Sequence, residues 1–161
     1  MLARLLTIKR EREREAIARL GDAQRKYDRL HAACQAKERE LQDFHDWREQ
    51  ETARLYEAVH RQKLSATKLD RYRQRIGFLR SRELKLEDEL ADARNALENA
   101  DRELTEHRRR GLEARRQVVR FEEYVSRLTG MEELREERGE ETETEETVAA
   151  RFTVERAETH G

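Results

Sequence analysis

Apolar residues recur along the second half of the chain at alternating spacings of three and four positions. The series is unbroken from Leu69 to Leu128, and fifteen of its eighteen positions are apolar, the exceptions being Glu83, His107 and Gly111. A heptad repeat of this regularity predicts a long α-helix that lies against another helix.

The first half of the chain carries a matching series. Pairing positions whose numbers add up to about 131 aligns both series, which sets Leu41 opposite Leu90 and Tyr27 opposite Leu104. We therefore predict an all-α fold, a long antiparallel two-helix coiled-coil hairpin. The matching series consists of Leu2, Leu6, Ala16, Leu20, Ala23, Tyr27, Leu30, Cys34, Leu41, Phe44, Leu55 and Ala58.

The predicted hairpin covers residues 1–138. Its first helix spans about 3–62, its turn 63–68, and its second helix about 67–130, fraying to 138. Thr67 followed by Asp70 has the spacing of a capping box, which favours a helix start near Thr67. The turn contains neither proline nor glycine, so a continuous kinked helix that pairs with another chain remains an alternative.

Charge separates the end of the chain from the rest. Residues 1–130 carry 31 Lys and Arg against 25 Asp and Glu, whereas residues 131–161 carry 4 against 11. Because the heptad series has ended and glutamate alternates with threonine, we predict that residues 139–161 are a disordered acidic tail.

At two levels of the seam between the helices the register pairs residues that are not typical of a heptad core. The register sets Arg48 opposite Glu83, and we predict that they pair across the seam and fix its register. The alternative is that both side chains extend outward into solvent. Gly21 and Gly111 also face each other, at a point of close packing or of bending.

Composition argues against most catalytic functions. With 44% charged residues, 35% hydrophobic residues and no proline, the chain is too polar to enclose a core with a pocket, so we expect no enzyme and no cofactor. The histidines lack metal-ligand spacing, which argues against a metal site. We expect Cys34, the single cysteine, to pack in the seam, with a redox role as the lesser alternative.

We also expect a cytoplasmic protein, because no segment is apolar enough for direct membrane insertion and the opening residues do not resemble a signal peptide. The basic band of Arg108, Arg109, Arg110, Arg115 and Arg116 is typical of a solvated face, so no nucleic acid is expected as a partner.

Large apolar residues off the seam are candidates for binding a partner. Trp47, Tyr56, Val59 and Phe78 lie near the turn. Aromatic side chains on a thin, charged helix pair favour a protein partner, although positions beside a seam also hold large side chains for packing alone. A second group lies where the termini meet and contains Leu2, Leu5, Leu6, Ile8, Phe121, Tyr124, Val125 and Leu128.

Several segments resemble the type III secretion stalk family, the injectisome proteins SctO/YscO, whose flagellar relative is FliJ. They are the opening MLARLLTIKRERER, Leu41–Arg48 (LQDFHDWR) with the following EQE and Leu55-Tyr56, and Leu69–Tyr72 (LDRY) with Arg75–Arg80 (RIGFLR). The resemblance covers about residues 1–135.

The resemblance implies a non-enzymatic stalk in the export apparatus of a Gram-negative bacterium, a virulence machine. Such a stalk is a monomer on the cytoplasmic face that links a hexameric secretion ATPase to the export gate protein and also binds secretion chaperones. It implies gate contacts near the turn at Phe44, Trp47, Arg48, Tyr56, Tyr72, Ile76 and Leu79, of which Phe44, Ile76 and Leu79 are also seam positions. It implies ATPase contacts at Leu2, Leu5, Leu6, Ile8, Phe121 and Tyr124.

Two other functions remain open. A generic coiled-coil scaffold or dimerisation module would share the heptads but form a stable dimer. A chaperone or effector of a secretion system would be a compact dimer, which the absence of strand-forming segments disfavours.

Overall fold

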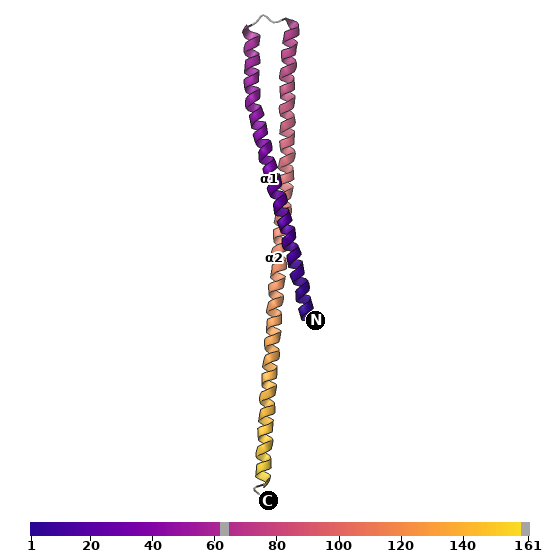
Figure 1. The fold of residues 1–161 in the computed structure, drawn as a ribbon, viewed down its shortest axis with the longest axis vertical. Helices are drawn as coiled ribbons and strands as arrows, with labels where there is room; N and C mark the ends of the chain where they lie inside the picture. The colour runs from indigo at the N-terminus through magenta and orange to yellow at the C-terminus, as the bar shows by residue number, and fades with distance from the viewer. Residues whose placement is uncertain (62–64, 159–161) are drawn as a thin grey trace. The chain divides into compact units, whose positions relative to one another are not determined.

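The computed structural model describes residues 1–61 and 65–158, and within these ranges it is entirely helical apart from Met1 and Ser65. Helix α1 spans Leu2–Arg61 and helix α2 spans Ala66–Glu158 (Figure 1). The chain divides into two compact units. The hairpin unit is Ala16–Gly111, and the terminal unit combines Met1–Glu15 with Leu112–Gly161.

In the hairpin unit the two helices are antiparallel, which confirms the predicted fold class (Figure 1). Ion pairs across the seam join Lys26 to Glu103 at 3.0 Å and Lys37 to Glu89 at 2.8 Å. Residue numbers thus rise along α1 as they fall along α2. The pairs agree with a register in which opposite positions add up to about 131.

The core of the hairpin unit is the seam itself. Every position of the heptad series from Leu79 to Gly111 is buried or half-buried. Burying a leucine side chain fully contributes about 2 kcal/mol relative to leaving it in water, so these positions hold the helices together. The buried apolar residues of the unit are Ala23, Cys34, Leu55, Leu79, Leu86, Leu90, Ala100 and Leu104.

Helix α2 starts one residue before the predicted start near Thr67, but Thr67 is not the residue that caps it. The carbonyl oxygen of Ser65 accepts a hydrogen bond from the Leu69 amide at 3.1 Å, so the first helical turn follows Ser65 directly. Thr67 already lies inside that turn, and the prediction that it caps the helix was wrong. Of the predicted turn, residues 63 and 64 lie outside the described residues, and 66–68 are helical.

The second difference is the length of α2. In the terminal unit α2 continues to Glu158 instead of fraying at 138, and all of its residues from 131 to 158 are exposed. The predicted disorder is therefore not found over residues 139–158, while residues 159–161 lie outside the described part. Glutamate, alanine and arginine are good helix formers, and helical hydrogen bonds are local. The end of the apolar series marked the end of pairing, not the end of the helix.

The two seam glycines have room for a side chain. A Cβ atom built on Gly111 would lie 3.8 Å from Leu20 Cδ2, and one on Gly21 would lie 3.5 Å from the flexible side chain of Arg25. Both distances are ordinary van der Waals contacts. Close backbone packing therefore does not explain either glycine, and a bend at this level stays a prediction.

Candidate functional site

The predicted residues near the turn all belong to the hairpin unit, and we call them the turn-end surface. They are Phe44, Trp47, Arg48 and Tyr56 on α1 and Tyr72, Ile76 and Leu79 on α2. Tyr56 is 68% exposed, Trp47 43% and Ile76 42%. By contrast, Leu79 is buried in the seam, and Phe44, Arg48 and Tyr72 are half-buried.

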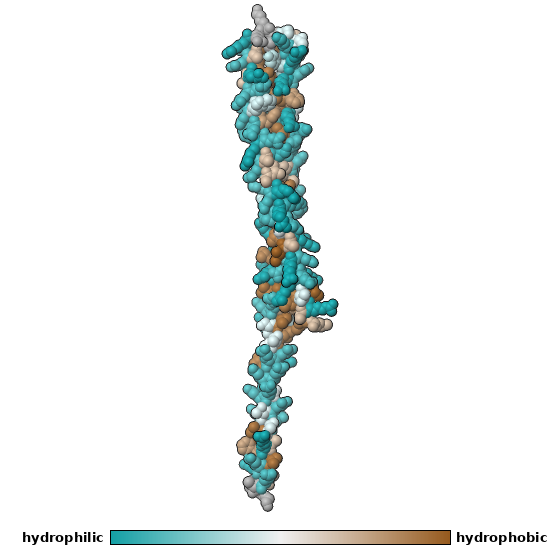
Figure 2. Space-filling view, viewed as in Figure 1, coloured by the Kyte–Doolittle hydropathy of each residue, from teal (hydrophilic) through white to brown (hydrophobic). Residues whose placement is uncertain are grey.

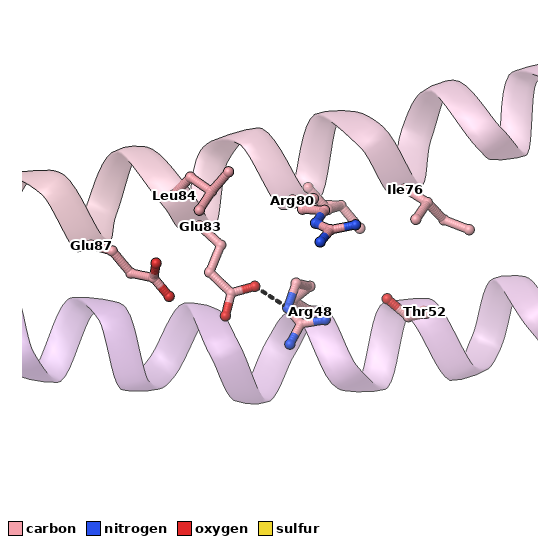
Figure 3. A pocket seen from close by; sticks show the side chains of 8 residues that line it. Arg48, Thr52, Ile76, Arg80, Glu83, Leu84 and Glu87 are labelled. Atoms are coloured by element: carbon pink, nitrogen blue, oxygen red, sulfur yellow. Dashed lines mark ion pairs between the residues drawn. The ribbon is translucent and has the colours of Figure 1, made fainter.

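A groove of about 440 Å³ lies between the helices within this surface (Figure 3). Leu79 supplies buried apolar surface, and Ile76 and Leu84 supply exposed apolar surface beside it. Two arginines and two glutamates balance the charge around these leucine and isoleucine side chains. The complete lining is Arg48, Thr52, Ile76, Leu79, Arg80, Glu83, Leu84 and Glu87.

Polar side chains form one layer of the seam at this groove. The Arg48 guanidinium lies against the Glu83 carboxylate, as the register predicts (Figure 3). His45 joins the layer, because its Nδ1 lies 2.9 Å from Glu83 Oε1 and its Nε2 lies 3.1 Å from Glu49 Oε1. The hydrogen bond to Glu83 raises the pKa of His45 above 6.5. This layer places charge pairs across the seam.

A second polar layer lies further along the same seam. Lys37 Nζ donates to Glu89 across the seam at 2.8 Å and to Glu40 on its own helix at 3.0 Å. The Glu89 hydrogen bond raises the pKa of Lys37, and the Lys37 ammonium lowers the pKa of Glu89. Both groups are therefore charged at neutral pH.

The predicted residues near the termini form the terminal surface of the terminal unit. Tyr124 is 53% exposed and Leu5 is 44% exposed. Leu2 and Ile8 are also exposed, whereas Leu6 and Phe121 are half-buried. Figure 2 shows apolar surface gathered around the N-terminal end of α1.

Basic side chains surround this apolar surface. Lys9 Nζ lies 5.6 Å from the centre of the Phe121 ring, and Arg10 pairs with Glu122 at 3.1 Å. Deeper in the seam of this unit, Arg115 donates to the buried Glu13 at 3.0 Å, which raises the pKa of Arg115. The carboxylate of Glu13 is thus buried with a charged partner.

Four groove residues were not predicted, namely Thr52, Arg80, Leu84 and Glu87, and Leu84 is the apolar one among them. Leu84 is 54% exposed and stands beside the seam. The sequence could have indicated Leu84 in the same way as Trp47 and Phe78, because all three are apolar residues outside the heptad series. Phe78 itself is 62% exposed.

The basic band is largely tied to neighbouring side chains. Arg109 and Arg110 both pair with Glu106, and the hydrogen bond from Arg109 is the main cause that lowers the pKa of Glu106 to about 2. Arg108 donates to Gln24. Over residues 1–61 and 65–158, no group of three or more His, Cys, Asp or Glu side chains is arranged to hold a metal ion. No helix in these ranges has an apolar stretch long enough to cross a bilayer.

Comparison with known proteins agrees with this architecture. The family model described as type III secretion protein YscO matches residues 2–150. The crystal structure of the type III secretion protein YscO from Vibrio parahaemolyticus is 27% identical, covers 91% of this chain and 92% of its own, and superposes with a TM-score of 0.80. Among curated proteins, none matches. The chain belongs to the YscO family of type III secretion proteins.

Proposed function

We propose that this protein is the central stalk component of a bacterial type III secretion export apparatus and links the hexameric secretion ATPase to the export gate protein. One observation carries the proposal. Each compact unit presents exposed apolar side chains beside a charge-covered helix pair. Such side chains on a helical protein of this composition are typical of protein-binding sites.

The terminal surface is the part that binds the ATPase in this proposal. Leu2, Leu5 and Ile8 leave apolar surface exposed on α1, and Tyr124 does so on α2. Lys9 and Arg10 add positive charge next to these residues. The support is the exposed apolar surface together with the resemblance to the stalk family.

The turn-end surface is the part that binds the export gate protein. Trp47, Tyr56 and Ile76 supply exposed contact area, while Leu79 supports the groove from within the seam. Aromatic residues bury a large area at low conformational cost, which makes Trp47 and Tyr56 the strongest candidates.

The proposed mechanism is mechanical. A helix pair held by a continuous seam of mostly apolar residues resists local opening, so it can transmit displacement between two bound proteins. No catalytic step or cofactor is part of the proposal. The protein acts as a monomer at the cytoplasmic face of the apparatus, and secretion chaperones are further partners.

Binding measurements with the purified cognate ATPase and the cytoplasmic domain of the export gate test the proposal. Leu5→Ser with Ile8→Ser should weaken binding to the ATPase and leave binding to the gate unchanged. Trp47→Ala with Tyr56→Ala should do the reverse. Leu134→Ser is the matched control, because this leucine is exposed outside both surfaces.

Two results would contradict the proposal. One is that both double variants bind both proteins as well as the unaltered chain does, with unchanged helix content. The other is a stable dimer in sedimentation velocity without binding to either protein, which would favour a coiled-coil scaffold.

A further inference from the structure

The two faces of the hairpin unit near the turn differ in charge. The groove of Figure 3 is electrically balanced, because Arg48 and Arg80 face Glu83 and Glu87. A second groove has four cationic side chains and a single carboxylate. Its lining is Glu51, Arg54, Leu55, Lys68, Arg71, Tyr72 and Arg75.

Helical spacing extends this second groove by two large aromatic residues. Trp47 precedes Glu51 by four residues, so the two share a face of α1. Phe78 follows Arg75 by three residues, and the Arg75 guanidinium carbon lies 6.0 Å from the centre of the Phe78 ring. We call this set the cationic face, and it comprises Trp47, Arg54, Lys68, Arg71, Tyr72, Arg75 and Phe78.

Arg54 is paired with Glu51 at 2.7 Å, but the other cations of the cationic face have no ion pair within the described residues. Residues 66–82 contain six Lys and Arg and one acidic residue, Asp70. Across the described ranges, no carboxylate lies within ion-pairing distance of Lys68, Arg71 or Arg75, whereas Lys26 and Lys37 on the same unit are paired. The face therefore has capacity for an external anion.

We propose that the cationic face binds the surface of an anionic phospholipid bilayer. Arginine and lysine have long apolar stems, so they can extend to phosphate while the Trp47 and Phe78 rings, 43% and 62% exposed, enter the interfacial region. Basic side chains near an anionic leaflet each add attraction that falls off within the screening length. No described helix is apolar enough to span a bilayer, so the association is peripheral.

A fluid lipid surface fits this face better than an acidic protein does. On α2 the cations Lys68, Arg71 and Arg75 lie along about two helical turns, with the rings of Tyr72 and Phe78 among and after them. Mobile headgroups can follow any such spacing, whereas fixed carboxylates on a protein must match it.

The chain contains one tryptophan, Trp47, which makes its fluorescence a direct report on this face. The full chain is titrated with vesicles of phosphatidylcholine containing about one-third phosphatidylglycerol, and separately with pure phosphatidylcholine vesicles. We expect a blue shift of the emission and co-sedimentation with the anionic vesicles alone, both weakened by added salt.

Two variants with the same change of net charge test whether vesicle binding depends on the cationic face or only on the total charge of the chain. Arg71→Glu with Arg75→Glu should weaken vesicle binding roughly tenfold or more. Arg80→Glu with Arg73→Glu makes the same change of charge on the same helix but outside the cationic face, and it should retain most of the binding. Circular dichroism of both variants checks that the helices are intact.

Three outcomes would overturn the proposal: no binding to anionic vesicles at low salt, equal binding to neutral vesicles, or equal loss in the two variants. A blue shift with soluble polyglutamate but not with vesicles would identify an acidic protein as the ligand instead. The proposal does not depend on binding to the export gate, because pure lipid is the probe.

Discussion

The paired and unpaired parts of α2 are equally helical but are held by different interactions. In the hairpin unit, heptad leucines such as Leu86 and Leu104 are only 2% exposed. In the terminal unit, every residue of 131–158 is exposed, including Met131 and Phe152. The comparison teaches that helix formation and helix pairing are separate properties, and that only pairing requires the apolar spacing.

The largest expected difference between the paired and the unpaired part of α2 is the cost of truncating a leucine. Leu104→Ala should lower the free energy of unfolding by about 2–5 kcal/mol, because it leaves a cavity in the seam. Leu134→Ala, on the exposed part, should change it by less than about 0.5 kcal/mol. Urea unfolding followed by circular dichroism measures both. Equal effects would mean that the exposed part is packed in solution.

The second largest effect on stability is expected from removing the Glu83 carboxylate from its polar layer in the seam. Glu83→Ala leaves Arg48 and His45 in the seam without their shared carboxylate, which should cost about 1–3 kcal/mol. Glu98→Ala removes an exposed pair with Arg102 on one helix and should cost about 0.5 kcal/mol or less. If urea unfolding gives Glu83→Ala the smaller cost, the layer does not hold the helices together.

Glycine replacements sharpen the comparison further. Gly111→Ala should raise the free energy of unfolding by about 1 kcal/mol, since the Cβ has room and alanine favours a helix. Gly139→Ala, on the exposed part, should leave the urea midpoint of the seam unchanged. A destabilised Gly111→Ala variant would show instead that the helices approach closely there.

The smallest expected effect depends on pH. Because the folded-state pKa of His45 is raised above 6.5, its contribution to stability is complete below about pH 6.5 and is lost as pH rises through the folded value. The effect is small because the side chain is 39% exposed. The difference in thermal midpoint between the unaltered chain and His45→Gln should shrink as pH rises. A difference that grows with pH would contradict this sign.

The pairing was predictable because it depends on residue spacing alone. The heptad series placed Arg48 opposite Glu83, and the structure pairs these two side chains, since one register must satisfy every level of a coiled coil. The helix over 139–158 was missed because the acidic composition was interpreted as a preference for disorder.

The composition of the turn-end groove was harder to predict. The hydrogen bond between His45 and Glu83 depends on the side-chain rotamers, and Leu84 lines the groove although it lies off the heptad series. Side-chain rotamers and the residues exposed beside the seam depend on packing in three dimensions. A heptad pattern describes the seam and not what surrounds it.

Cys34 gives the molecule a practical property. Its thiol, the only one in the chain, is 4% exposed and free of any disulfide within the described residues. Thiol reagents reach a buried sulfur slowly under native conditions. Cysteines introduced at exposed positions can therefore be labelled selectively with dyes or spin labels, without first removing the native residue.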